Sequence, residues 1–97
     1  MLILITDIKS ECFIWNKLKE RANIIKHGVD FYSAAEAFKD KERKIFIDEQ
    51  HSSDEERYFC IAKVNGRILT VRFTCRDKLI RIIGAGFWRK GKDYYEN

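Results

Sequence analysis

The chain has 97 residues, of which 45% are hydrophobic and 35% are charged. This length and balance describe one small folded domain and exclude a disordered or fibrous chain. The 19 Lys and Arg residues outnumber the 15 Asp and Glu residues, so the net charge is +4 and a strongly acidic protein is excluded. A basic chain is compatible with a polyanionic partner, although a solvated basic surface also explains this charge.

Targeting signals and cysteine usage favour a cytoplasmic protein. No apolar run approaches the ~20 residues of a transmembrane helix, so we expect no membrane partner. Residues 1–5 are apolar but lack a basic flank, and Asp7 ends the run, so a signal peptide is not predicted. The three cysteines and two histidines lack the spacing of a disulfide framework or a zinc site. We therefore predict reduced thiols, no metal and no cofactor.

The N-terminal third predicts a capped helix. Residues 1–8 are interpreted as a short strand or an arm, and residues 12–15 as a second apolar run. Asn16 can cap a helix over residues 17–27, which ends before Gly28. Apolar side chains recur along this helix at i, i+4 and i+7 and should face the core: Leu18, Ala22 and Ile25.

A second helix follows, and the hydrophobic period then changes from 3.6 to 2. Asp30 can cap this helix, which ends near Lys39 and is apolar at Phe31, Ala34, Ala35 and Phe38. The alternation then predicts strands over residues 45–47, 58–64, 67–74 and 79–83, a charged loop over residues 48–56, turns at Asn65-Gly66 and Arg76-Asp77, and a short helix over residues 88–96. The sequence thus predicts a single α+β domain over residues 1–97, with an extra strand or arm at residues 1–12. The two N-terminal helices would pack on an antiparallel β-meander, followed by the short C-terminal helix.

The Asn65-Gly66 turn fixes the register of the two central strands. It sets three apolar pairs opposite each other: Tyr58 and Phe73, Cys60 and Val71, and Ala62 and Leu69. A turn at Arg76-Asp77 would then set Phe73 opposite Ile80 and Val71 opposite Ile82. This face is apolar and should form the core, so Cys60 is interpreted as a buried hydrophobic residue and not as a nucleophile.

The opposite face of the predicted sheet carries an arginine cluster. Arg72 falls opposite Arg81, and Arg57 lies one diagonal step from Arg72. Like charges opposite each other destabilise a sheet by about 0.2–1 kcal/mol per pair, so the cluster needs an anionic partner. One interpretation is that a carboxylate of residues 54–56 pairs with these arginines. The other is a phosphate-binding site, because guanidinium groups bind phosphate oxygens two at a time.

Three further features each have a structural and a functional interpretation. His27, beside Lys26, can act as a general acid or base, or as a cation that complements the dipole at the end of its helix. His51 is interpreted as a solvated residue of the charged loop. Residues 88–95 mix cations with aromatic rings, as a surface for single-stranded nucleic acid does, but an amphipathic helix with a buried tryptophan gives the same pattern.

Five stretches of the sequence follow one another in a characteristic order: residues 13–16 (Phe-Ile-Trp-Asn), 23–29 (Asn-Ile-Ile-Lys-His-Gly-Val), 31–38 (Phe to Phe), 51–57 (His to Arg) and 81–83 (Arg-Ile-Ile). In this combination they resemble the BrnT toxins. Those chains open with a Phe-Glu-Trp-Asp-like strand, a helix ending Asn-x-x-Lys-His-Gly-Val and a Phe-x-x-Ala-x-x-x-Phe helix. They continue with His-Ser-x-x-Glu-Glu-Arg and Ile-Arg-Ile-Ile. The resemblance covers residues 13–96.

This resemblance implies the fold of RelE-like ribonuclease toxins. It also implies the role of toxin in a type II toxin–antitoxin pair, which inhibits translation by cutting RNA. The implied partner is a DNA-binding antitoxin that neutralises the toxin and represses the shared operon, so operator DNA would be reached only through the antitoxin. The chain departs from the family pattern after the last strand, where many members carry two arginines and this sequence has Gly86 and Phe87.

The enzyme hypothesis is a metal-independent endoribonuclease, in which the 2′-hydroxyl of the RNA substrate attacks the adjacent phosphate. We expect Arg57 and Arg81 to hold the scissile phosphate, with His27 and Lys26 as further catalytic residues. The nucleic-acid-binding residues would be Arg72, Arg89 and Lys90. The alternative is a non-catalytic interaction protein that binds its antitoxin or nucleic acid but has lost nuclease activity, because Gly86 and Phe87 replace the two arginines.

Overall fold

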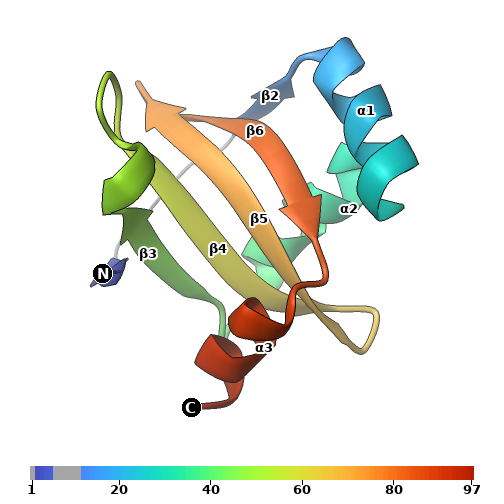
Figure 1. The fold of residues 1–97 in the computed structure, drawn as a ribbon, viewed down its shortest axis with the longest axis vertical. Helices are drawn as coiled ribbons and strands as arrows, with labels where there is room; N and C mark the ends of the chain where they lie inside the picture. The colour runs from blue at the N-terminus through green and yellow to red at the C-terminus, as the bar shows by residue number, and fades with distance from the viewer. Residues whose placement is uncertain (1, 6–11) are drawn as a thin grey trace.

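The computed structural model describes the backbone of residues 2–5 and all of residues 12–97, which form an α+β fold around one mixed sheet (Figure 1). In chain order, the elements are β1 (Leu2–Ile5), β2 (Cys12–Trp15), α1 (Lys17–His27), α2 (Phe31–Glu36), the 3-10 turn η1 (Ala37–Lys39), β3 (Lys44–Asp48), the 3-10 turn η2 (Glu49–His51), β4 (Arg57–Val64), β5 (Arg67–Arg76), β6 (Leu79–Gly86) and α3 (Arg89–Glu96). None of these helices is long and apolar enough to cross a bilayer.

The sheet has the strand order β1-β3-β4-β5-β6-β2. The predicted antiparallel meander is present in β3 to β6. The sheet is nevertheless not all antiparallel, because β2 pairs with β6 in parallel, from Cys12 opposite Leu79 to Trp15 opposite Ile82. Parallel pairing is open to these strands because the intervening chain gives the long crossover that it requires. β1 is antiparallel to β3 at the other edge. The remaining residues of the predicted N-terminal segment, 1 and 6–8, lie outside the described residues.

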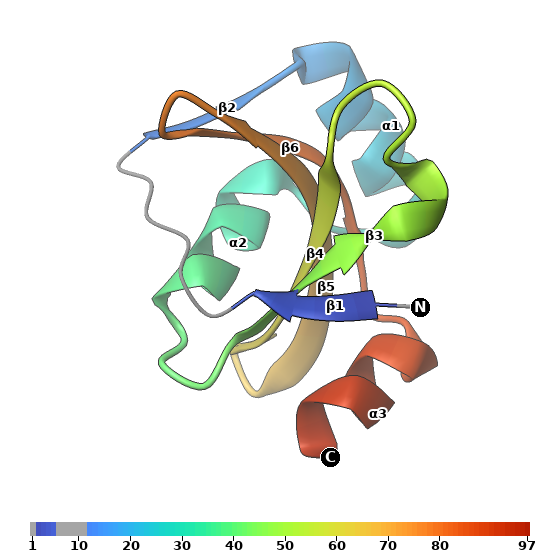
Figure 2. The same ribbon diagram turned by 90° about the vertical axis from the view of Figure 1, so that its left-hand side faces the viewer.

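The core lies between α2 and one face of the sheet, and α3 lies on the other face (Figure 2). The Asn65-Gly66 register is confirmed, because Cys60 pairs with Val71 and both side chains are fully buried. α2 and η1 contribute Phe31, Ala34 and Ala37 to the same core. The interpretation of Cys60 as a core residue is therefore confirmed, and burial raises the pKa of its thiol to about 12.

The register between β5 and β6 differs from the prediction. The turn is formed by Asp77 and Lys78, which both have positive φ (52° and 67°), so Arg76 and not Cys75 begins the pairing, opposite Leu79. An irregularity between Arg72 and Phe73 then shifts the register again. As a result Phe73 pairs with Ile82 instead of Ile80, Val71 pairs with Ala85 instead of Ile82, and Arg72 pairs with Gly84 instead of Arg81.

Helix α1 has the predicted bounds but not the predicted orientation. Its N-cap is confirmed, because the Asn16 side chain accepts hydrogen bonds from two backbone N–H groups of the first turn. The stripe that was expected to face the core is exposed: Leu18 is 77% and Ile25 is 81% accessible, and Ala22 is exposed as well. The buried residue of α1 is Asn23. The helix therefore lies at the β6 edge of the sheet (Figure 1) and does not pack an apolar face on it.

Asn23 takes the position of a neighbouring strand at this edge. Its side-chain nitrogen donates to the carbonyl oxygen of Ala85 (2.9 Å), and its side-chain oxygen accepts from the N–H of Ala85 (3.1 Å). The same nitrogen also donates to the carbonyl of Val29 (2.9 Å). These bonds satisfy backbone groups of β6 beyond the point where β2 ends, which explains why a polar residue is buried here.

Candidate functional site

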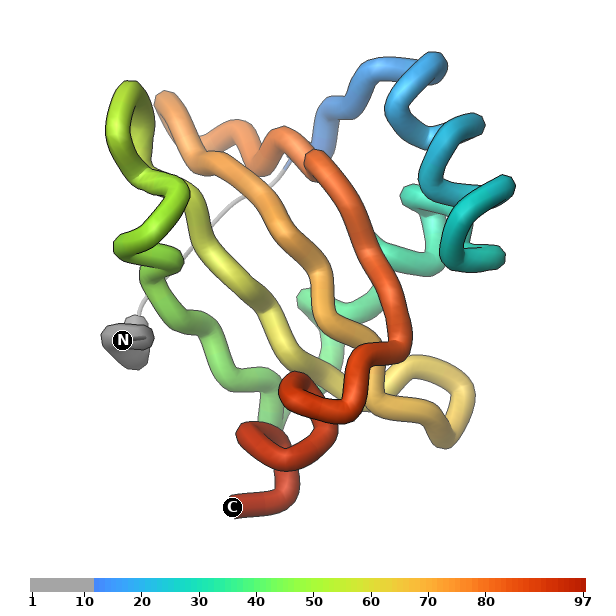
Figure 3. The backbone as a smooth tube through the Cα atoms, in the orientation of Figure 1, coloured from blue at the N-terminus to red at the C-terminus, as the bar shows by residue number. Residues whose placement is uncertain are grey.

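The sheet face that points away from the core carries three rows of residues that run across β4, β5 and β6. The first row is Arg57, Thr74 and Arg81; the second is Phe59, Arg72 and Gly84; the third is Ile61, Thr70 and Gly86. The end of β3 and the starts of β4 and β6 meet at the same end of the sheet (Figure 3), so the first row lies beside η2. Helix α3 covers the third row.

Arg57 and Arg81 converge in one cavity, which we call the arginine site. This cavity has a volume of ≈ 340 Å³, and its lining also includes His51, Glu55 and Arg76. Arg81 Nη2 lies 3.1 Å from Glu55 Oε1, and their side chains are 54% and 31% exposed. The predicted carboxylate partner thus exists for Arg81, whereas Arg57 forms no ion pair within residues 12–97. One half-buried arginine remains available for an anion.

Arg72 belongs to the middle row and not to the arginine site. Its guanidinium group lies against Gly84, where an added Cβ would come within 2.7 Å of Nη2. In the same way, the ring of Trp88 lies against Gly86, where a Cβ would come within 2.7 Å of it. The glycines of β6 therefore leave room for these two side chains, and Gly86 accommodates the ring of Trp88.

Next to the arginine site, His51 forms a pair with a buried carboxylate that the sequence interpretation missed. His51 Nδ1 lies 2.6 Å from Oδ2 of Asp48, whose side chain is 8% exposed, while the His51 side chain is 60% exposed. An ionised carboxylate can only accept, so Nδ1 donates and Nε2 of the neutral ring stays available as an acceptor. The Asp48 carbonyl also accepts from the hydroxyl of Ser52, which in turn accepts from the Arg57 N–H.

The signal for this pair was present in the sequence as an Asp-x-x-His spacing. Side chains at i and i+3 lie above one another on a 3-10 turn, and η2 brings Asp48 and His51 together in this way. Most side chains of residues 49–56 are exposed, as the prediction of a solvated loop requires, and Asp48 is the buried exception. The η2 turn and the Ser52 hydrogen bonds give this loop local order that its charge does not predict.

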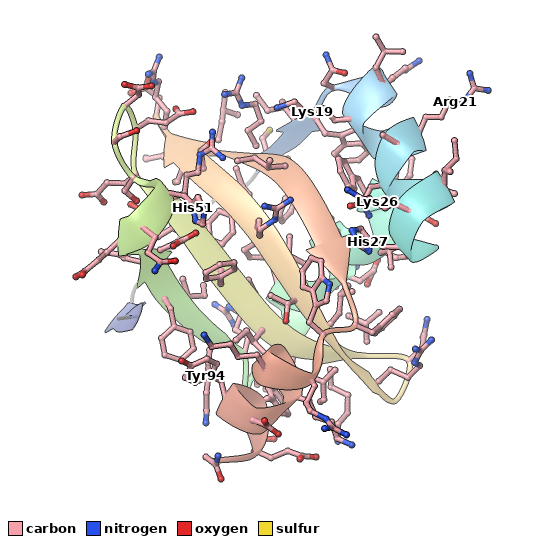
Figure 4. All side chains as sticks on the ribbon, in the orientation of Figure 1. Lys19, Arg21, Lys26, His27, His51 and Tyr94 are labelled. Carbon is pink, nitrogen blue, oxygen red and sulfur yellow. The ribbon has the colours of Figure 1, made fainter. Side chains whose placement is uncertain are left out.

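Lys26 and His27 lie at a distance from the arginine site. Figure 4 shows both at the end of α1, on the far side of β6, whereas His51 lies next to β4. Neither is among the residues that line the arginine site. The His27 ring instead contacts Trp88, with ring centroids 5.2 Å apart. The four expected catalytic residues therefore fall into two pairs, because α1 follows the second half of β6 and not its start.

A second cavity, which we call the aromatic cavity, lies between α3 and the sheet. It has a volume of ≈ 350 Å³, and its walls include Phe59, Trp88 and Tyr94, with His51 and Lys90 also in its lining. Arg89 is on another side of α3, where it lines a separate depression with Arg67 and Phe87. The predicted nucleic-acid-binding residues Arg72, Arg89 and Lys90 are all exposed.

The titratable groups that line the two cavities are Arg, Lys, His, Tyr and carboxylate side chains. In the part of the chain that is described, no group of three or more His, Cys, Asp and Glu residues is placed to hold a metal ion. The arrangement joins two guanidinium groups and an oriented imidazole in one solvent-accessible site. Such a set can bind a phosphate and move a proton.

Comparison with known proteins identifies the family. A family model described as the ribonuclease toxin BrnT of type II toxin–antitoxin systems matches residues 15–91, while no curated protein gives a significant match. The matched segment contains every residue of the arginine site and the expected catalytic and nucleic-acid-binding residues. The chain therefore belongs to the BrnT family of ribonuclease toxins of type II toxin–antitoxin systems.

Proposed function

We propose that this chain is an endoribonuclease toxin that cuts RNA by attack of a 2′-hydroxyl on the adjacent phosphate, and that it inhibits translation in the cytoplasm in this way. The observation that carries the proposal is the arginine site, in which two guanidinium groups converge beside the Asp48–His51 pair. Family membership supports the ribonuclease and toxin parts of the proposal. The RelE-like fold stays a prediction.

Arg57 and Arg81 hold the scissile phosphate in this proposal. They flank Thr74 on the two neighbouring strands, so their guanidinium groups approach one phosphate from two sides. An arginine pair stabilises the negative charge that develops on the phosphate oxygens as the attacking oxygen bonds to phosphorus. Arg81 exchanges Glu55 for the phosphate, which costs little because exposed ion pairs contribute about 0–1 kcal/mol. The reaction in this form is independent of a metal ion.

His51 takes the role of general base. Nε2 accepts the proton of the 2′-hydroxyl, O2′ bonds to phosphorus, and the bond between phosphorus and O5′ breaks. The departing O5′ takes a proton from water, which reaches the open site, and the proton on His51 Nε2 neutralises the hydroxide that is left, so the ring returns to its neutral form. The products are a 2′,3′-cyclic phosphate and a 5′-hydroxyl. Asp48 is a positioning residue, because its hydrogen bond to Nδ1 keeps the ring in one tautomer.

The other basic residues bind the flanking RNA. Arg72 lies one row, or two residues along β5, from the arginine site, a distance of about 6.8 Å along the strand. Lys90 and Arg89 continue the positive charge over α3. Lys26 and His27 are assigned to RNA binding on the far side of β6 instead of to proton transfer, because the arginine site is not within their reach.

The test is cleavage of a mixed-sequence RNA by the purified chain, with and without EDTA. We expect cleavage in both conditions, products with cyclic phosphate ends, and no cleavage next to a 2′-deoxy nucleotide. Arg81→Ala and His51→Ala should each lower the rate by about 100-fold or more. Arg81→Ala should keep the free energy of unfolding within about 1 kcal/mol, because its side chain is exposed. His51→Ala also removes the partner of the buried Asp48 carboxylate, so it should lower the free energy of unfolding by about 1–3 kcal/mol while the chain stays folded.

The matched control is Arg21→Ala, which removes an exposed arginine from α1 and should cut like the parent. Equal rates for the parent, Arg81→Ala and His51→Ala would overturn the assignment of the site. A parent chain that binds its antitoxin but cuts no RNA would establish the non-catalytic alternative. Growth arrest on expression, relieved by the co-expressed antitoxin, tests the inhibition of translation in the cell.

The family implies an antitoxin partner, and the exposed stripe of α1 is the surface we propose for it. Leu18, Ala22 and Ile25 follow one another on the outer side of the helix, opposite the buried Asn23. Helical geometry places Lys19 and Lys26 on one side of this stripe, and Lys17 and Arg21 on the other. An acidic amphipathic segment of a DNA-binding antitoxin fits such a surface, and operator DNA is reached only through that partner.

A further inference from the structure

Contacts between helix α3 and strands β3 and β5 hold the walls of the aromatic cavity in place. The Tyr94 ring packs against Phe46 with centroids 5.4 Å apart, and the Tyr94 carbonyl accepts from Lys44 Nζ at 2.8 Å. At the other end of α3, Gly91 lies directly on Thr70, where an added Cβ would clash with the Thr70 hydroxyl. Helix α3 is thus held at both ends, so the cavity beneath it is already formed before a ligand enters.

The cavity has apolar walls and a polar rim. Phe59 of β4 forms part of the floor, Trp88 and Tyr94 form walls, and the rim carries Gln50 and Lys90. Aromatic walls favour a flat, unsaturated ligand, because its ring can stack on a wall with an offset or meet it edge to face. The Gln50 amide supplies both donors and an acceptor at the rim. This combination fits a heteroaromatic ring with polar groups on its edge.

The cavity also adjoins the arginine site. His51 lines both cavities, so it lies where the two meet. A ligand that fills both must join a planar ring to a phosphate through a short linker. A nucleotide has this composition, with ribose as the linker and the 2′-hydroxyl in the region of His51.

We propose that the aromatic cavity binds one unpaired nucleobase of the RNA whose phosphate is held in the arginine site. The inference rests on the proposed function and adds a base-binding subsite to it. The base must be unpaired, because a base in a duplex is stacked on both faces and cannot enter a cavity that is closed on one side by α3. The chain thus selects single-stranded or locally unstacked RNA next to the cleavage point.

The experiment uses Trp88 as the reporter. The sequence has two tryptophans, Trp15 and Trp88, so Trp15→Phe leaves Trp88 as the source of indole fluorescence. The probes are single-stranded hexadeoxynucleotides, which lack the 2′-hydroxyl and are not cut, and a series in which one abasic site is moved along the strand. We expect the intact probes to quench Trp88, and one abasic position to weaken binding by roughly 5- to 150-fold, the equivalent of stacking one base.

Protein variants add a second arm. Tyr94→Ala should weaken binding of the intact probe but not of the abasic probe that has lost the bound base, while the control Tyr32→Ala removes a 72% exposed ring elsewhere and should change neither. Gln50→Ala changes only the rim and should reduce the preference among bases. The abasic series needs no substitution in the cavity, so it tests the subsite even if Tyr94→Ala does not fold.

Equal binding of intact and abasic probes without quenching of Trp88 would overturn the base-binding subsite. So would quenching by an apolar peptide of the antitoxin when no oligonucleotide quenches, because the cavity would then be a protein-binding site. Cleavage is measured separately on RNA. Loss of base-dependent quenching with retained cleavage refutes the subsite alone, and base-dependent quenching without any cleavage refutes the nuclease proposal alone.

Discussion

At the scale of single residues, the most informative side chain is Asn23. It is the buried residue of a helix whose apolar side chains face solvent, and its amide group satisfies the backbone of Ala85 and Val29. Buried amide groups are stabilising only while every partner is present, because an unsatisfied buried group costs about 1–3 kcal/mol. The attachment of α1 to the sheet therefore depends on hydrogen bonds more than on apolar contact.

This dependence predicts a large effect of Asn23→Leu, which keeps the branching at Cγ and the number of side-chain heavy atoms but removes the donors and the acceptor. At least two buried backbone groups lose their partner, so the free energy of unfolding should fall by roughly 2–4 kcal/mol. Urea denaturation followed by circular dichroism measures it. Lys19→Leu, on the same helix but exposed, is the control and should stay within about 0.5 kcal/mol. Equal stability of both variants would show that Asn23 does not hold α1.

Prediction of single residues from the sequence succeeded where the alternation of side chains along a strand sets their position. It failed where the conformation of a turn sets their position. Arg57 and Arg81 could be placed on one face because side chains alternate along strands. The pairing of Arg72 with Arg81 was wrong because the turn uses Asp77 and Lys78, both with positive φ, which a lysine seldom adopts. His51 was missed as a site residue because its ring is oriented by a hydrogen bond with Asp48, and only the η2 turn brings these two side chains together.

At the scale of elements, the sequence predicted which segments are helices and strands better than where they pack. The bounds of α1 follow from Asn16 and Gly28, a side-chain cap and a residue with φ of 70°. The packing of α1 does not follow from its apolar stripe, because the stripe suits a partner as well as a core. The parallel pairing of β2 with β6 could not be read from short apolar runs, which carry no information on direction.

The carboxylate of Asp40 joins η1 to both β4 and helix α3. Asp40, after η1, accepts from the Lys63 N–H of β4 at 2.8 Å and from the Tyr95 hydroxyl of α3 at 2.6 Å. Desolvation raises the pKa of Asp40, but the hydrogen bonds from Lys63, Tyr95 and Glu42 outweigh it and lower this pKa below its usual value of 3.8. The ionised form is thus the one that holds α3.

From this direction of shift we expect acid to loosen the fold. A carboxyl group whose pKa is lower in the folded chain stabilises it above the unfolded pKa of about 4, and this stability is lost as the pH falls through the folded pKa. The free energy of unfolding, measured in urea from about pH 6 to pH 2, should therefore fall less steeply in Asp40→Asn than in the parent. Asp54→Asn, an exposed carboxylate of the loop before β4, is the control and should follow the parent. Parallel curves for the parent and Asp40→Asn would contradict this assignment.

At the scale of the whole molecule, two surfaces serve two different partners. The arginine site and the aromatic cavity lie on the open face of the sheet, between η2 and α3. Helix α1, which carries the exposed stripe, lies beside the second half of β6 (Figure 4), and its His27 contacts Trp88. Binding of an antitoxin to the apolar stripe of α1 and binding of RNA to the sheet can therefore be altered separately by substitutions that leave Lys26 and His27, the α1 residues assigned to RNA, unchanged.

Because these two surfaces are separate, we expect that a variant can lose affinity for the antitoxin and still cut RNA. Leu18→Ser combined with Ile25→Ser removes the two large apolar side chains of the stripe, at 77% and 81% accessibility, and should cost the fold little. If both are central contacts, antitoxin affinity measured by calorimetry should fall by about 100-fold or more, since each central contact contributes about 1–2 kcal/mol or more. RNA cleavage in the absence of antitoxin should equal that of the parent.

Leu79→Ser, which removes a half-exposed leucine at the opposite end of β6, is the control and should leave antitoxin affinity unchanged. Undiminished antitoxin affinity in the double variant would show that the partner docks elsewhere, and a parallel loss of cleavage would show that the two surfaces are not independent.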